Sequence, residues 1–331
     1  MKNNLISKPS NLRQYFAAIL LLLTVSGSVS AQDTRDSILI GTIDTHIHTE
    51  EEYAILEGGS MDMVDLAKRA RDKGMRAIVI KSLKFETATR AYLTHKQVPG
   101  IEVYGGLTLD MSVGGMNAEA VRAMASLKLP NAKMVWMPAL DSKAGVIASG
   151  QKRDYVVVSE NGKLTPATLA VLDTVAKYGF SLATSHLGAD EALLIVRAAR
   201  QRNITVVVTH ATQQPVLMSV AQMKEAANLG AYIEHTAFGD FKGPQSHFFK
   251  SFYKNQPRVE IKKVAQYIKE VGAEHTILAT DLGQAFSPTP PDGLKWFMMS
   301  LLKEGITPAQ IDLMTRVNPA KLLHLEPAPS K

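Results

Sequence analysis

The residues best suited to chemistry lie in the stretch Ile38–Glu50, ILIGTIDTHIHTE, where an apolar run gives way to closely spaced Asp and His residues. Alternate side chains of a β-strand share a face, so Asp44, His46 and His48 would point the same way. Two imidazoles placed in this way can bind one metal ion, and imidazole suits zinc and its first-row neighbours. The alternative interpretation is an ordinary strand that ends in polar loop residues.

Three further polar residues stand at the ends of later apolar runs. His186 follows FSLATS, His210 follows ITVVVT, and Asp281 follows HTILAT. When parallel strands close into a barrel, their carboxyl ends form one rim, and catalytic groups gather there. One His at a strand end is more often structural, but three such ends after an HxH strand predict a shared site.

The elements that would position these residues alternate along the chain. Roughly eight β-branched, apolar runs are each followed by a stretch with helical spacing of its apolar residues. This alternation predicts parallel strands joined by helical crossovers. About eight such units form an α/β fold of the (β/α)8, or TIM barrel, type. An open doubly wound sheet is the alternative, but no Gly-rich dinucleotide fingerprint follows the first strand.

Caps and turn residues mark several boundaries of these elements. Ser60 is the expected N-cap of a helix that ends at Gly74, and Thr165-Pro166 is expected to start another. Between them, the polar stretch 141–164 follows the fourth strand. Its Asn161-Gly162 pair predicts a small β-hairpin insertion.

The first thirty-one residues have the pattern of a secretory signal peptide. A basic start precedes the apolar run YFAAILLLLTV, and small residues ending in SVSA follow it. This run is shorter than the roughly 20 residues that span a bilayer. We therefore predict cleavage after Ala31, a periplasmic or secreted location, and one mature barrel domain over residues 32–331. An uncleaved membrane anchor is the alternative.

The composition limits which binding partners and which metal ligands can be expected. The chain has 37 basic and 31 acidic residues; Lys2, Lys8 and Arg13 belong to the leader, which leaves a charge of +3. This balance gives no reason to expect a nucleic acid, or a membrane after cleavage, as partner. The expected partner is a small-molecule substrate, and a homo-oligomer remains open. Because the chain lacks Cys, a metal site must use His, carboxylate or modified Lys.

The five residues His46, His48, His186, His210 and Asp281 together resemble the ligand pattern of the amidohydrolase superfamily, which has HxH on strand one, His on strands five and six, and Asp on strand eight. The late segment VNPAKLLHL is similar to that family's terminal helix. More narrowly, four segments resemble a poorly characterised branch of unknown substrate: MVDLAKRARDKGMRAIVIKS, GGLTLDMSVGGMN, MVWMPALD and ATDLGQ.

The resemblance implies a metal-dependent hydrolase that uses one or two divalent ions, with zinc as the first expectation. A divalent ion with an open position lowers the pKa of bound water from about 15.7 toward 7. The resemblance further implies that Asp281 accepts the proton of that water and passes it to the leaving group. This arrangement is used to hydrolyse C–N bonds, lactone or ester C–O bonds, and phosphoesters. The residues therefore do not determine which type of bond is cleaved.

One departure concerns the second metal position. Many members of the superfamily bridge two metals with a carboxylated Lys or a Glu at the end of strand four, where this chain has only Asp141. Lys81, at the end of the second strand, offers three alternatives. It could carry a bridging carbamate, hold an anionic substrate group as an ammonium, or form a buried salt bridge.

Three residues near the expected rim have less specific signals. Glu234 and His235 end the seventh strand, where a period of two allows only one to face inward, and we expect substrate contact or structural pairing there. Asp44 is expected to orient a ligand or the strand end.

Two rival functions remain open. A phosphoesterase of the polymerase-and-histidinol-phosphatase type also begins with HxH, but usually has a late DxH where this chain has TDLG. A non-catalytic periplasmic binding protein on the same barrel is the other rival, although its site should have lost some of the five ligands.

Overall fold

The computed structural model describes residues 36–53, 58–244, 255–285 and 287–326. The predicted leader over residues 1–31 and the cleavage point after Ala31 lie outside these ranges, so both stay predictions. None of the helices within these ranges is long and apolar enough to cross a membrane.

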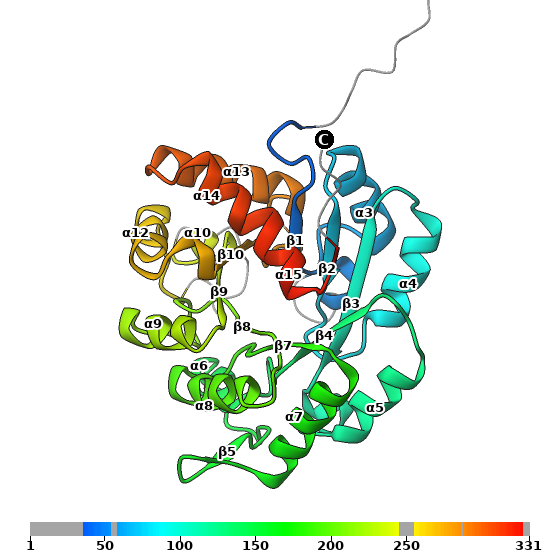
Figure 1. Cartoon of the computed structure of the whole chain (residues 1–331), viewed down its shortest axis with the longest axis vertical. Helices are drawn as coiled ribbons and strands as arrows, with labels where there is room; N and C mark the ends of the chain where they lie inside the picture. The colour runs from blue at the N-terminus through cyan, green and yellow to red at the C-terminus, as the bar shows by residue number, and fades with distance from the viewer. Residues whose placement is uncertain (1–35, 54–57, 245–254, 286, 327–331) are drawn as a thin grey trace, which may run out of the picture. The chain divides into compact units, whose positions relative to one another are not determined.

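Eight parallel strands form the barrel, and their order in space is their order along the chain (Figure 1). Backbone hydrogen bonds join the last strand end to the first, because the Asp281 N–H donates to the His46 carbonyl at 2.7 Å and the His48 N–H to the Leu282 carbonyl at 2.8 Å. The predicted TIM barrel is therefore confirmed. Its strands are β1 (Ile43–Ile47), β2 (Ala77–Ile80), β3 (Glu102–Thr108), β4 (Ala132–Trp136), β7 (Ser181–Ala183), β8 (Val206–Val208), β9 (Tyr232–Thr236) and β10 (Thr276–Ala279).

Helices follow the strands and lie around the outside of the barrel (Figure 1). The longer ones are α3 (Met63–Asp72), α4 (Ala88–Gln97), α5 (Ala118–Ser126), α7 (Pro166–Tyr178), α8 (Ala189–Arg200), α9 (Val220–Asn228), α12 (Ile261–Val271) and α13 (Pro290–Lys303). Short helical segments are α2 (Glu50–Tyr53), η1 (Met111–Val113), α6 (Lys143–Ala148), α10 (Phe238–Phe241), η2 (Ala273–His275), α14 (Pro308–Asp312), η3 (Leu313–Val317) and α15 (Asn318–Leu322).

Side-chain caps explain where several helices begin. The Thr165 hydroxyl accepts the Thr168 N–H at the start of α7, as predicted from the sequence. The expectation for Ser60 was wrong, because the side chain of Asp62 caps α3 by accepting the backbone N–H groups of Val64 and Asp65. Asp62 lies directly before the first helical turn. Its negative carboxylate also interacts favourably with the partial positive charge at the N-terminus of the helix.

The insertion after β4 contains the predicted hairpin, formed by the antiparallel strands β5 (Ser159–Glu160) and β6 (Lys163–Leu164). The sequence pattern missed the short helix α6 at the start of this stretch.

An apolar cluster fills the barrel interior, from the amino ends of β1 and β10 to the last residue of β4. Ile43, Val79, Trp136 and Ile277 pack there with Leu322 of α15, and all five are at most 2% exposed. Burying each such side chain stabilises the fold by roughly 1.5–3 kcal/mol. α15 covers the amino ends of the strands, and the polar residues that follow the strands lie at the opposite, carboxyl end.

Candidate metal centre

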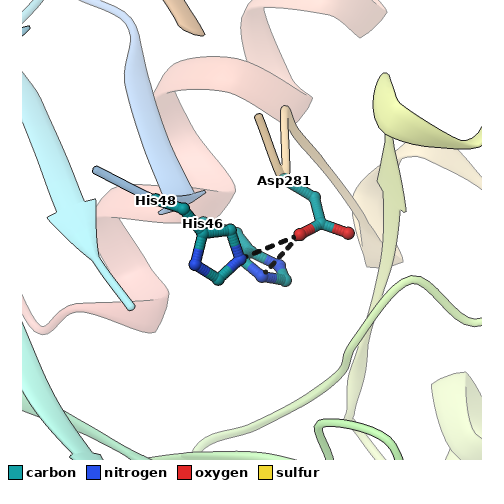
Figure 2. Close-up of side chains that lie close together, drawn as sticks. All are labelled: His46, His48 and Asp281. Carbon is teal, nitrogen blue, oxygen red and sulfur yellow. Dashed lines mark hydrogen bonds and ion pairs between the residues drawn. The ribbon is translucent and has the colours of Figure 1, made fainter. Parts of the chain in front are cut away.

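The end of β1 and the end of β10 bring two imidazoles to one carboxylate. The Nε2 atoms of His46 and His48 each lie 3.1 Å from the Oδ1 atom of Asp281 (Figure 2). The nearest ligand atoms of these three buried residues all lie within 4.8 Å of one another. The backbone bond between His46 and Asp281 places both residues at the seam where the barrel closes. Residues more than 230 positions apart thus form one cluster.

Hydrogen bonds to the other ring nitrogen fix how both imidazoles are turned. The His48 Nδ1 atom lies 2.9 Å from the Lys81 carbonyl, which can only accept, so Nδ1 carries the proton. The His46 Nδ1 atom donates in the same way to Oε1 of Glu234, at 2.9 Å. Both rings therefore direct their Nε2 atoms towards Asp281, and these are the atoms that would bind a metal.

The charges of the cluster act on one another strongly. Burial alone would lower the pKa of His46, but the carboxylates of Asp281 and Glu234 outweigh it and raise that pKa to about 9. Burial lowers the pKa of His48 to about 4, despite its bond to Asp281. Burial opposes ionisation of Asp281, yet His46 and His48 hold the pKa of that carboxyl well below its usual range. Asp281 is therefore an anion at neutral pH.

His186 and His210 extend this cluster from β7 and β8. The His210 ring centroid lies 5.9 Å from that of His46 and 5.0 Å from that of His186. Burial is the main cause that lowers the pKa of both imidazoles well below the usual value, so both are neutral. Neutral imidazole is the form that binds metals.

The backbone is strained where these strands end. His210 and Asp281 have φ angles of +30° and +55°, and Ser185, directly before His186, has +52°. Non-glycine residues rarely adopt positive φ angles, and they do so only where the surrounding packing imposes the conformation. Such strained residues are found most often at functional sites.

Asp44 ties β1 to β10 beneath the cluster. Its Oδ1 accepts the backbone N–H groups of His46 at 3.2 Å and Thr280 at 3.1 Å, and its Oδ2 accepts the Thr280 hydroxyl at 2.6 Å. These bonds position the residues just before Asp281 and around His46, which is the orienting role expected from the sequence.

Glu234 and His235 take different faces of β9. One oxygen of Glu234 accepts both the His46 Nδ1–H and, at 3.1 Å, the His210 backbone N–H, so it positions two histidines. His235 instead stacks on Tyr267 of α12, with ring centroids 6.0 Å apart, on the outer side of the barrel. The structure thus brings Glu234 to the predicted site and leaves His235 away from it.

Of the two candidates for a metal bridge, Lys81 lies beside the cluster and Asp141 does not. The Asp141 carboxylate binds Arg153 at 2.5 Å and the Met111 N–H at 2.9 Å. Lys81 is fully buried, and its Nζ has no hydrogen-bond partner in the described part of the chain. Burial lowers its pKa, and the carboxylates of Asp281, Glu234 and Asp110 partly oppose this.

Sequence reasoning did not identify Lys242, which follows α10 in the loop after β9. Lys242 is 6% exposed, and its ammonium is among the charges that act on His186, His210 and Asp281. A lysine in an aromatic-rich loop carries no motif, so only the fold could reveal this position.

The residues present fit a bound divalent cation. His210 Nδ1 is buried and has no hydrogen-bond partner among the described residues. Buried polar atoms are usually satisfied, so such exceptions call for a missing ligand. Imidazole nitrogens with one carboxylate oxygen are a common ligand set for zinc in catalytic sites.

A protein-family model matches more than half of the chain. The model of DUF6282, a family of unknown function, matches residues 41–234, which include the HxH strand and both later histidines. The chain belongs to the DUF6282 family. No protein of curated function matches this DUF6282 chain.

Solved structures similar to this DUF6282 protein share its barrel. One is a provisionally named 2-pyrone-4,6-dicarboxylic acid hydrolase from Pseudomonas putida, at 14% identity and a TM-score of 0.56, covering 87% of this chain and 99% of that one. An amidohydrolase from Pseudomonas aeruginosa has 14% identity and a TM-score of 0.55, with 87% and 96% covered. A 2,6-dihydroxybenzoate decarboxylase from Rhizobium has 12% identity and a TM-score of 0.51, with 86% and 99% covered. At these identities the likeness shows the fold, in agreement with the resemblance to amidohydrolases.

Proposed function

We propose that this DUF6282 protein is a metal-dependent hydrolase that cleaves a C–N bond, or a lactone or ester C–O bond, in a small molecule. The observation that carries the proposal is the convergence of His46 Nε2 and His48 Nε2 on Asp281 Oδ1, at 3.1 Å each. The cluster lies at the carboxyl end of a TIM barrel, where the active sites of this fold occur.

His46, His48 and Asp281 would hold the cation, and His186 and His210, on the same side of the barrel, would be the further ligands. We infer zinc as the first candidate, with one or two ions bound. Such a cation, when bound, supplies Lewis-acid chemistry: it lowers the pKa of water and polarises a carbonyl or phosphoryl oxygen.

The chain's own residues supply proton transfer and orientation. Asp281 is ionised at neutral pH because of the neighbouring histidines, so its carboxylate is ready to accept a proton from water and return it to a leaving group. Glu234 holds His46, and the Lys81 carbonyl holds His48, so the two rings need not reorganise during a reaction.

The test combines metal content with activity on the purified mature protein. We expect about one or two equivalents of zinc or a similar ion by elemental analysis, and turnover of at least one member of a panel of lactones, N-acyl compounds and dipeptides. Phosphoester turnover alone would favour the phosphoesterase, and folded protein that binds no metal would favour the binding protein. Release of CO2 should be followed too, since one structural neighbour is named a decarboxylase.

The metal content of Lys81→Ala distinguishes a carbamate role of Lys81 from a substrate-binding cationic role. A carbamate bridge predicts that about half of the metal is lost, whereas a cationic Lys81 predicts unchanged metal and a raised KM for anionic substrates. We further propose that the protein is exported, and mass spectrometry of exported protein should then show a chain that begins at Gln32.

A further inference from the structure

Lys242 is a buried cation without a strong partner among the residues that the structure describes. It is 6% exposed, and the nearest acceptor among the described residues, the Gln214 carbonyl, lies at 3.5 Å, the limit for a hydrogen bond. Its ammonium also lies over the Phe238 ring, 4.9 Å from the centroid. Burial lowers the pKa of Lys242 to about 8, so the ammonium form still predominates at neutral pH.

The chain holds Lys242 next to the candidate ligands. The backbone N–H groups of Ala237 and Phe238 donate to the carbonyls of Ala279 and Thr280, directly before Asp281. At the other end of α10, Asp240 binds Arg258 at 2.9 Å. The backbone of α10 is thus fixed to the end of β10. This restricts the position of Lys242, which directly follows α10.

The local charge balance favours an anion. The strand order places Lys81 after β2 and Lys242 after β9 on the two sides of the seam between β10 and β1, where His46, His48 and Asp281 lie. The Lys242 ammonium acts on the Asp281 carboxylate, and a divalent cation would add two further positive charges. Buried charge without a counter-charge is costly, so a ligand that brings negative charge relieves it.

We propose that Lys242 recognises a carboxylate on the substrate, so that this site acts on small carboxylic acids rather than on neutral molecules. The inference rests on the proposed function and narrows its substrate class. One ammonium matches the single charge of a carboxylate better than the double charge of a phosphate.

The test uses pairs of probes whose metal-binding group is the same. The monohydroxamates of succinate, glutarate and adipate carry a free carboxylate, and in the matched probes a carboxamide replaces it. Their affinities for zinc-loaded mature protein are measured by titration calorimetry, for wild type, Lys242→Met and Lys143→Met. Lys143 is an exposed lysine of α6, after β4 at the same end of the barrel, and serves as control.

We expect at least one carboxylate probe to bind the wild-type protein about tenfold or more tightly than its carboxamide partner, as for a charge-assisted hydrogen bond. Lys242→Met should abolish this preference, leave carboxamide affinity and zinc content within about twofold, and keep or raise the melting temperature because a poorly partnered buried charge is removed. Lys143→Met should keep the preference, and Lys242→Arg should restore part of it.

Three results would overturn the inference while leaving the hydrolase proposal intact: no preference in the wild-type protein, a preference that survives in Lys242→Met, or tighter binding of the matching phosphonates than of the carboxylates. Should Lys242→Met fail to fold, Lys242→Gln gives the same comparison. A protein that binds neither zinc nor any hydroxamate would instead contradict the proposed function itself.

Discussion

Glu234 Oε1 lies 2.9 Å from His46 Nδ1, although the two residues are 188 positions apart in the chain. The carboxylate thereby turns His46 Nε2 towards Asp281, and it also accepts the backbone N–H of His210. One residue of β9 therefore orients candidate ligands from β1 and β8. Carboxylates in this position raise the basicity of a ligand imidazole and fix its proton.

Replacing this carboxylate should weaken the metal site without removing a ligand. Glu234→Gln is expected to lower zinc affinity by about 10- to 100-fold, because a neutral amide is a poorer acceptor for His46. Competition with a chromophoric chelator measures the change. Glu260→Gln, at an exposed position, should bind zinc as the wild type does. If Glu234→Gln bound zinc with the same affinity as the wild type, Glu234 would have no role in orienting the metal ligands.

Asp281 is expected to matter more for turnover than for metal content. Asp281→Asn keeps an oxygen near His46 and His48 but removes the proton acceptor, so hydrolysis should fall by about 10²–10⁴-fold. Elemental analysis should show that most of the zinc is retained. Substantial hydrolysis by this variant would exclude Asp281 as the group that transfers the proton.

Gly283 allows β10 to approach β1 behind His48. Its φ angle is +137°, and a Cβ atom there would lie 2.1 Å from the His48 carbonyl oxygen. Gly283→Ala should therefore lower the free energy of unfolding by more than about 2 kcal/mol and displace His48 from the metal. Gly162 also has a positive φ angle, but a Cβ there has no neighbour within 4 Å.

Urea unfolding of Gly283→Ala and the control Gly162→Ala separates the two effects. The control should cost only about 1 kcal/mol and keep its zinc. If both variants lost a similar amount of unfolding free energy, the close approach of Gly283 to the His48 carbonyl would not be required for stability.

Asp110 should make stability depend on pH. Burial, followed by the charge of Asp141, raises the pKa of Asp110 from the ordinary 3.8 to about 7. Between these values the folded protein holds a proton that the unfolded chain releases, so this group's contribution to stability is greatest at low pH and falls as pH rises towards 7.

Asp110→Asn cannot ionise, and the amide oxygen can still accept the Ala139 N–H that Asp110 binds at 2.6 Å. The variant should therefore gain stability relative to wild type between pH 4.5 and pH 8, by at most about 4 kcal/mol. Urea unfolding at both pH values measures this gain, and exposed Asp154→Asn is the control. A difference between variant and wild type that is the same at both pH values would contradict the raised pKa.

The sequence predicted the barrel and the candidate ligands because both depend on local patterns. Alternation of strands and helices sets the topology, and His46, His186, His210 and Asp281 each stand where an apolar run ends. The roles of Glu234 and Lys242 depend on contacts between β9, β1 and the loop beside β10, which no local period encodes. The Ser60 cap was wrong for a similar reason, since Ser60 and Asp62 are both good caps and only packing of α3 selects between them.

The most direct test of the account is the anomalous diffraction of crystals of zinc-loaded mature protein, recorded on both sides of the zinc absorption edge. The account predicts a strong peak within coordination distance of His46 Nε2, His48 Nε2 and an Asp281 oxygen. A well-folded protein whose peak lies elsewhere, or which shows none at saturating zinc, would contradict the metal centre and with it the proposed hydrolase.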